Sequence, residues 1–178
     1  LAAENVRMRF IGDRSRLDGK LQKLMAGIEA RTAPYSRLNL TVAINYGGRD
    51  EILRAARKLA QDVAEGRLAP SQITEAMLSS RLDTADLPDP DLVIRTSGET
   101  RTSNFLPWQS AYSEYEFTPT LWPDFTPEEL ARVPWLALPS GSASTGGPRI
   151  GFASIPRGAT PQCCSIRPAT PTCPCCAA

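Results

Sequence analysis

Histidine is absent from the 178 residues, and the acidic residues stop well before the end of the chain, because all 19 Asp and Glu lie at or before Glu129. Cysteine has the opposite distribution: all five cysteines, with eight of the sixteen prolines, lie in residues 134–178. This shift in composition divides the chain into residues 1–133, which have the mixture typical of a globular domain, and a Pro/Gly/Ser/Cys-rich tail.

The tail, residues 134–178, also lacks hydrophobic periodicity. A segment of this kind has too little patterned apolar surface to form a core, so we expect the tail to be a disordered, aberrant extension of the domain. Its cysteines offer an alternative, a zinc site. The cysteine spacing disfavours that alternative, because it contains no pair of C-x-x-C motifs and the chain has no histidine.

Long apolar runs are missing too. Nowhere do about 18 apolar residues follow one another, and the first ten residues, L-A-A-E-N-V-R-M-R-F, are not an apolar leader. These two absences lead us to expect a cytoplasmic protein. The chain begins with Leu1 rather than Met, which we interpret as a fragment or a processed product.

A strong net charge is the last absence. The three arginines of the tail supply +3 of a net charge of +1, which leaves −2 for residues 1–133. Domains that bind nucleic acid usually carry a basic stripe with aromatic platforms, so we predict no nucleic-acid partner.

Residues 1–133 contain an alternation of strand and helix patterns. Apolar residues alternate with polar or basic ones in residues 6–11 and 38–45, and residues 92–94 form a short apolar run. Between them, apolar residues recur at helical spacing in residues 52–63 and in a stripe made of Leu21, Leu24, Met25 and Ile28. We predict an α/β fold with a mostly parallel sheet flanked by helices.

The polar loop that follows residues 92–94 is the best candidate for a binding site. It holds Arg95 and Arg101, whose planar guanidinium groups can each bind two phosphoryl oxygens. Ser97, Ser103 and the backbone N–H groups around Gly98 can donate to the remaining oxygens. Because ligands of α/β folds bind at the carboxyl ends of the strands, we predict a phosphate site here.

Other interpretations of this region stay open. A helix that begins at residues 103–104 and continues through the spaced aromatic residues up to Tyr112 would add its partial positive charge to the site. The turn at Gly47 and Gly48 either approaches a phosphate or simply reverses the chain. The alternative for the two arginines of the loop is that they are surface partners of Asp91 and Glu99.

Four motifs, in order along the chain, resemble the cis-prenyltransferase family, to which the bacterial undecaprenyl diphosphate synthases belong. They are F-I-G-D-R-S-R-L (residues 10–17), I-N-Y-G-G-R-D-E-I (44–52), R-T-S-G-E-T-R-T-S-N-F-L-P-W-Q-S-A-Y-S-E (95–114) and L-W-P-D-F (121–125). The resemblance covers roughly residues 5–132. It corresponds to the later part of a family member, so we expect a fold that is incomplete at its N-terminus.

The resemblance implies prenyl transfer, in which an allylic diphosphate such as farnesyl diphosphate is extended with isopentenyl diphosphate to a polyprenyl diphosphate. In the family's pattern Arg95, Arg101 and Ser103 hold the isopentenyl diphosphate. Glu114 corresponds to a residue that binds Mg²⁺.

The resemblance also implies properties of the whole protein. Leu38 and Leu40 would belong to the wall of an apolar tunnel for the growing chain. By the same resemblance we expect a homodimer that makes the lipid carrier of cell wall synthesis and contacts the membrane through its product.

One departure from the family concerns catalysis. The D-G-N-x-R motif, which carries the family's catalytic Asp and binds the allylic diphosphate, does not occur in residues 1–178, so no catalytic residue is assigned. We therefore expect the chain alone to be inactive. Two other functions remain open: a non-catalytic partner subunit of a prenyltransferase, and a generic phosphate-binding α/β module.

Overall fold

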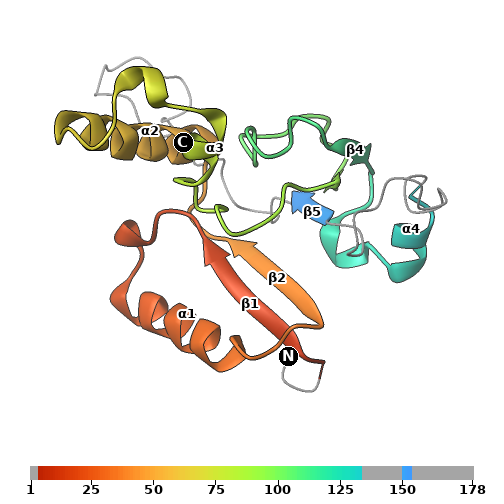
Figure 1. The fold of residues 1–178 in the computed structure, drawn as a ribbon. Coiled ribbons are helices and arrows are strands. Elements are labelled where there is room, and N and C mark those ends of the chain that lie inside the picture. The colour runs from red at the N-terminus through yellow and green to blue at the C-terminus, as the bar shows by residue number, and fades with distance from the viewer. Residues whose placement is uncertain (1–3, 134–149, 154–178) are drawn as a thin grey trace, which may run out of the picture.

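The computed structural model describes residues 4–133 and 150–153, whose five strands are all parallel and form two separate sheets (Figure 1). In one sheet, β1 (Val6–Ile11) pairs with β2 (Leu38–Ala43). In the other, β3 (Leu92–Arg95) lies between β4 (Glu114–Phe117) and β5 (Ile150–Ala153). The predicted α/β class with parallel strands and flanking helices is confirmed, although the described strands do not form one continuous sheet.

The first unit is β1, α1 (Gly19–Thr32) and β2, with the short 3-10 helix η1 (Arg14–Arg16) after β1. Asp18 caps α1 by accepting the Lys20 N–H at 2.9 Å. Side chains of α1 also bind the outer edge of β1: Thr32 accepts the Met8 N–H at 3.0 Å, and Glu29 accepts the Phe10 N–H at 2.9 Å. The helix therefore satisfies backbone donors that a neighbouring strand would otherwise take.

The apolar stripe of α1 is only partly buried. Met25 is 1% exposed, as expected of a core residue, whereas Leu24 is 56% exposed and Leu21 is 36% exposed. An apolar stripe at helical spacing usually faces a core, but these two leucines lie outside it.

The second unit contains two helices and a 3-10 turn. α2 (Gly48–Ala64) buries Glu51, Ala55 and Leu59, which are spaced by four residues and so share one face. It packs beside α3 (Glu75–Ser79), which follows η2 (Pro70–Gln72). None of the helices in residues 4–133 is long and apolar enough to span a bilayer.

The β3 sheet has its own core. Leu92 and Ile94 are buried with Val133, and Phe125, Leu130 and Ile150 pack against them. After β4, the chain forms η3 (Trp122–Asp124) and α4 (Pro127–Ala131), where Thr126 and Glu129 make reciprocal capping hydrogen bonds.

Strand β5 comes from the tail. The expectation of a disordered tail is wrong for Ile150–Ala153, because these residues pair in parallel with β3, Ile150 opposite Leu92. Pairing supplies backbone hydrogen bonds that do not depend on a side-chain pattern, which is why composition gave no sign of it. The tail cysteines lie outside the described residues.

The segment between β3 and β4 also differs from the prediction. Residues 103–113 form turns instead of a helix. Ser103, Asn104 and Leu106 have positive φ values of 49°, 65° and 47°, which an α-helix of L-residues excludes. Residues 103–113 therefore do not begin a helix whose N-terminus could face the predicted phosphate loop.

Candidate active site

Arg95 is the last residue of β3 and begins the predicted phosphate loop. The residue is 3% exposed, and its Nη2 donates to the Ser103 hydroxyl at 3.3 Å. The same nitrogen lies 3.5 Å from a carboxylate oxygen of Glu99, while Nε has no hydrogen-bond partner among the described residues. A buried N–H donor without an acceptor costs free energy, so the Nε of Arg95 is available to donate to a further anionic ligand.

Arg101 is the exposed partner in the same loop. Its side chain is 67% exposed and its Nη2 lies 2.5 Å from Glu99 Oε2. Arg95 therefore lies next to Ser103, and both arginines lie within ion-pair distance of Glu99. The structure thus contains the ion pair with Glu99 that the alternative interpretation proposed, so in this conformation Glu99 supplies the negative charge between the two arginines.

Two backbone amides of the loop, those of Ser97 and Gly98, are occupied. Ser97 and Gly98 adopt left-handed φ values of 74° and 69°, and their N–H groups donate to the carbonyls of Thr120 at 2.8 Å and Thr118 at 3.0 Å. The expectation that the amide of Gly98 is free for a phosphate oxygen is wrong for this conformation, because the end of β4 already takes that donor.

The first turn of α2 is occupied as well. Gly48 N–H donates to the backbone carbonyl of Asn104, and Arg49 N–H donates to its side-chain oxygen, both at 2.9 Å. Asn104 therefore caps α2 from outside the helix, and the Gly47–Gly48 turn serves packing rather than a phosphate. Glycine is required at position 48, since a Cβ there would collide with Pro107.

Glu114 lies away from the arginines. It is the first residue of β4 and pairs with Leu92, while Arg95 pairs with Phe117 at the other end of the same strands. At a rise of about 3.3 Å per residue, three residues separate the two ends by about 10 Å. The structure thus does not bring this exposed carboxylate to the loop, and within the described residues no cluster of three or more His, Cys, Asp or Glu could hold a metal ion.

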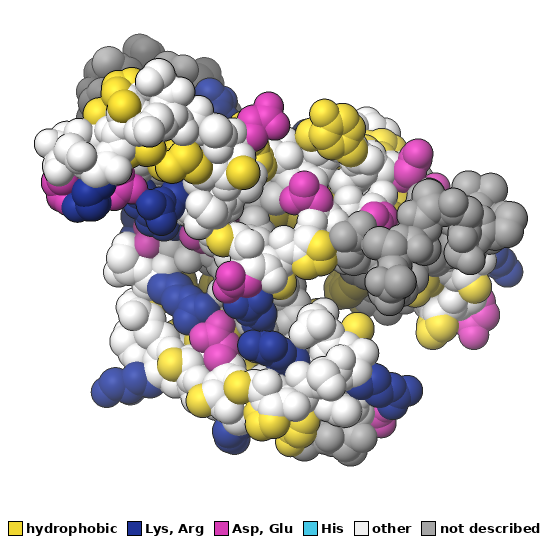
Figure 2. All heavy atoms as spheres, in the orientation of Figure 1, with side chains coloured by type: hydrophobic (Ala, Val, Ile, Leu, Met, Phe, Trp, Pro, Cys, Tyr) yellow, Lys and Arg dark blue, Asp and Glu magenta, His cyan; other side chains and the backbone are white. Residues whose placement is uncertain are grey.

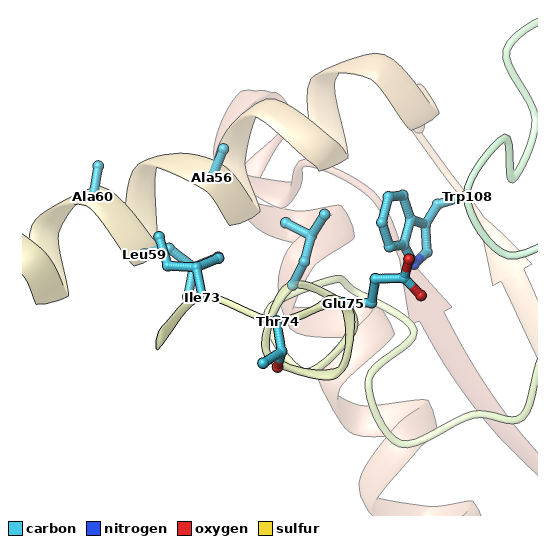
Figure 3. A pocket seen from close by; sticks show the side chains of 8 residues that line it. Ala56, Leu59, Ala60, Ile73, Thr74, Glu75 and Trp108 are labelled. Atoms are coloured by element: carbon cyan, nitrogen blue, oxygen red, sulfur yellow. The ribbon is translucent and has the colours of Figure 1, made fainter. Parts of the chain in front are cut away.

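The predicted tunnel residues Leu38 and Leu40 are exposed on β2, with 56% and 41% of their surface accessible. They do not line the apolar groove that the structure forms elsewhere, a space of about 430 Å³ between α2, α3 and Trp108 (Figure 3). Its lining residues are Ala56, Leu59, Ala60, Ile73, Thr74, Glu75, Leu78 and Trp108. The sequence analysis did not predict this groove.

Charged residues near the two sheets pair with one another. Arg54 binds Asp83 with two nitrogens, at 2.9 and 2.8 Å, and Asp83 also accepts the Gly12 N–H at 3.1 Å. Burial alone would raise the pKa of Asp83, but the hydrogen bonds and charge of Arg54 outweigh it and hold that pKa below its ordinary value. Figure 2 shows the same interleaving of basic and acidic side chains over much of the visible face.

One buried polar cluster, centred on Glu51, was not predicted from the sequence. This residue is 1% exposed and accepts hydrogen bonds from Tyr46 at 2.6 Å, from the Asp83 N–H at 2.8 Å and from Gln109 at 3.1 Å. A signal was present: Glu51 stands four residues before Ala55 and eight before Leu59, which places a carboxylate on the buried face of α2.

Comparison with known proteins gives the family of the chain. The family model described as "Putative undecaprenyl diphosphate synthase" matches residues 1–135. An isoprenyl transferase of Agrobacterium fabrum is 58% identical over 125 residues, which are 70% of this chain and 51% of the relative. A ditrans,polycis-undecaprenyl-diphosphate synthase of Xanthomonas axonopodis pv. citri, named as specific for (2E,6E)-farnesyl diphosphate, is 61% identical over 125 residues, 70% of this chain and 49% of the relative.

A solved structure gives the same result. The crystal structure of lavandulyl diphosphate synthase from Lavandula x intermedia, in complex with dimethylallyl diphosphate, superposes with a TM-score of 0.69 at 40% identity, covering 71% of this chain and 55% of that chain. This chain spans about half the length of the curated relatives it matches. With a family model that matches three quarters of its residues, and with parallel sheets shared with a solved member, the chain belongs to the undecaprenyl diphosphate synthase family of prenyltransferases.

Proposed function

We propose that this chain carries the isopentenyl diphosphate site of a cis-prenyltransferase, and that the whole protein extends an allylic diphosphate such as farnesyl diphosphate to a polyprenyl diphosphate. The observation that supports this most directly is the buried Arg95. Its Nε has no hydrogen-bond partner among the described residues, its Nη2 donates to Ser103, and it shares the carboxylate of Glu99 with Arg101. Family membership and the substrate in the name of the Xanthomonas relative support the choice of substrates.

In this proposal the residues of the loop bind the diphosphate and orient it. Arg95 is fixed by burial and offers donors at a set position, so it would hold one phosphoryl group without reorganisation. Arg101 is exposed and bound only to Glu99 in the described residues, so it can turn from that carboxylate to the diphosphate. A diphosphate carries more negative charge than a single carboxylate and would compete with Glu99 for both guanidinium groups.

Mg²⁺ belongs to this proposal only in part. Mg²⁺ commonly takes one or two carboxylates and completes its octahedral shell with water and substrate phosphates, and there it neutralises charge on the leaving diphosphate. Glu114 supplies one exposed carboxylate, at the end of the β3–β4 pair opposite to Arg95. The described residues therefore do not form a magnesium site by themselves, and Glu114 would contribute one ligand of a site completed from outside them.

Several properties of the whole protein follow from the same proposal. We infer a homodimeric, cytoplasmic enzyme that contributes to the cell wall lipid carrier and contacts the membrane through its product. We also propose that residues 1–133 form the partial prenyltransferase domain and that the tail is an extension of it. A non-catalytic partner subunit and a generic phosphate-binding module are the competing functions.

Calorimetric titration of the full chain with isopentenyl diphosphate tests the proposal. We expect saturable binding that Arg95→Met abolishes and that Arg57→Met, at an exposed position of α2, leaves unchanged. Absence of binding by the unaltered chain would contradict the proposed site. Equal affinity for inorganic phosphate would favour the generic module, because only an isopentenyl diphosphate site gains from the second phosphoryl group.

A further inference from the structure

The segment that carries Ser103 has a backbone conformation that its own residues disfavour. Ser103 and Leu106 have φ values of 49° and 47°, in the left-handed region where only glycine and, to a lesser degree, asparagine are common. Strain of this kind persists only where the surrounding structure holds it in place. Contacts outside the segment must therefore determine where the Ser103 hydroxyl lies.

The first turn of α2 supplies one set of these contacts. Asn104 accepts two of the free N–H groups of that turn, those of Gly48 and Arg49, at 2.9 Å each. Pro107 packs on the bare Cα of Gly48. Residues 104–107 are thus shaped against the start of α2.

Gln109 supplies the second set. It is 4% exposed, and its Nε2 donates both to Glu51 Oε2 at 3.1 Å and to Thr84 Oγ1 at 2.7 Å. Its own side-chain oxygen has no hydrogen-bond partner among the described residues, so the amide contributes here as a donor. Glu51 belongs to the same first turn of α2 that Asn104 and Pro107 contact.

We infer that Gln109 is a positioning residue for the diphosphate loop: its hydrogen bond to the buried carboxylate of Glu51 holds residues 103–109 on the first turn of α2 and thereby fixes Ser103 against Arg95. This inference deepens the proposed function and rests on it for the identity of the ligand. Gln109 does not contact the diphosphate itself and acts through Ser103.

The chemistry of Glu51 explains why an amide is needed at position 109. A buried carboxylate requires several donors, and it has three, from Tyr46, from the Asp83 backbone and from Gln109. Burial, and then the hydrogen bond to Glu51, raise the pKa of the Tyr46 hydroxyl, so it remains a donor. Leucine at position 109 would remove one donor, and glutamate there would place a second carboxylate beside the first.

The experiment compares Gln109→Leu and Gln109→Glu with the double variant Glu51→Gln/Gln109→Glu, in which amide and carboxylate exchange places. Gln22→Leu is the control, because Gln22 also donates a side-chain hydrogen bond, to Leu17 O at 2.9 Å, but from α1. Calorimetry gives the affinity for isopentenyl diphosphate. NMR hydrogen exchange gives the protection of the Gly48 and Arg49 amides, which report directly on Asn104.

We expect both single variants to weaken isopentenyl diphosphate binding roughly ten-fold, the effect of one hydrogen bond to a charged group, and to expose the two amides to exchange. The double variant should restore most of both signals, a coupling that general destabilisation would not produce. Gln22→Leu should change neither.

Two results would overturn the inference: unchanged amide protection in Gln109→Leu, or a double variant that is no better than Gln109→Glu. If the unaltered chain binds no isopentenyl diphosphate, the proposed function fails, and amide protection alone then decides whether Gln109 holds the segment. Should Gln109→Leu not fold, Gln109→Asn, which keeps the amide but shortens its reach, replaces it with the same expected loss of protection.

Discussion

Arg54 and Asp83 form a two-point ion pair, with nitrogen–oxygen distances of 2.9 and 2.8 Å, that joins α2 to the end of β1 through the Asp83 hydrogen bond to Gly12. Neither side chain is fully exposed. Each of the two carboxylate oxygens of Asp83 accepts a hydrogen bond from one guanidinium nitrogen of Arg54. Such a pair is sensitive to the loss of one partner, because the other is then left with an unpaired charge.

This pair predicts an acid-sensitive fold. The pKa of Asp83 is lowered from an ordinary 3.8, so its ion pair stabilises the folded state fully above that value, and the stabilisation is lost as pH falls below it. We expect the melting temperature to drop on acidification through this range and the drop to be smaller in Asp83→Asn, which starts from a lower stability. Thermal unfolding followed by circular dichroism between neutral and acid pH measures both. An identical acid dependence in the two proteins would contradict the assignment.

The exposed arginine of the loop predicts a change in kinetics. In a chimera of this chain with the remaining half of the Agrobacterium relative, Arg101→Lys should lower kcat/KM for isopentenyl diphosphate roughly ten-fold, because an ammonium cannot bind two phosphoryl oxygens at fixed spacing. Arg57→Lys is the control. Steady-state kinetics with labelled isopentenyl diphosphate measure the effect, and unchanged kinetics in Arg101→Lys would favour its role as a surface partner of Glu99.

A related prediction concerns the missing motif. The chain of 178 residues should form no polyprenyl product from farnesyl diphosphate, isopentenyl diphosphate and Mg²⁺, because it contains no D-G-N-x-R sequence to bind the allylic diphosphate. The chimera, to which the relative adds the N-terminal part that carries this motif in the family, should form product. Thin-layer analysis of labelled lipids distinguishes the two, and product from the 178-residue chain well above background would disprove the expectation.

Glycine at position 48 predicts a stability effect. Gly48→Ala introduces a Cβ that collides with Pro107, so we expect a loss of about 1–3 kcal/mol in the free energy of unfolding. Gly19→Ala, at a helix position where nothing lies within 4 Å of the new Cβ, should be neutral or stabilising. Urea denaturation measures the difference, and equal effects of the two substitutions would argue against the contact with Pro107.

Strand β5 predicts that the parts of the tail before and after Ala153 contribute differently to stability. Truncation after Val133 removes β5 and the packing of Ile150 on Leu92 and Ile94, and should cost about 1–3 kcal/mol of stability, the contribution of one aliphatic side chain. Truncation after Ala153 keeps both and should leave the melting temperature unchanged. If the two truncated chains melt together, β5 does not stabilise the β3 sheet.

The sequence predicts the elements whose side-chain pattern determines them. The strands before residues 12 and 44, the capped helix after Asp18, and the grouping of Arg95, Arg101 and Ser103 follow from periodicity, capping and family motifs. The turns of residues 103–113 do not follow, because spaced aromatic residues suggest a helix while the positive φ values depend on contacts with α2. Gln109 was missed because only the fold shows that this polar residue is buried and paired with Glu51. Glu51 was missed although its spacing from Ala55 and Leu59 places it on the buried face of α2.

The pairing of β5 also limits how the β3 sheet can be extended. Both edges of β3 are taken, by β4 on one side and by β5 on the other. A strand contributed by another polypeptide therefore has two routes: it adds beside β2, β4 or β5, or it competes with Ile150–Ala153 for the hydrogen-bonding groups of β3. In the second case Ile150–Ala153 would occupy one edge of β3 until the other strand displaces them. Their release from β3 would then indicate that the other strand has bound.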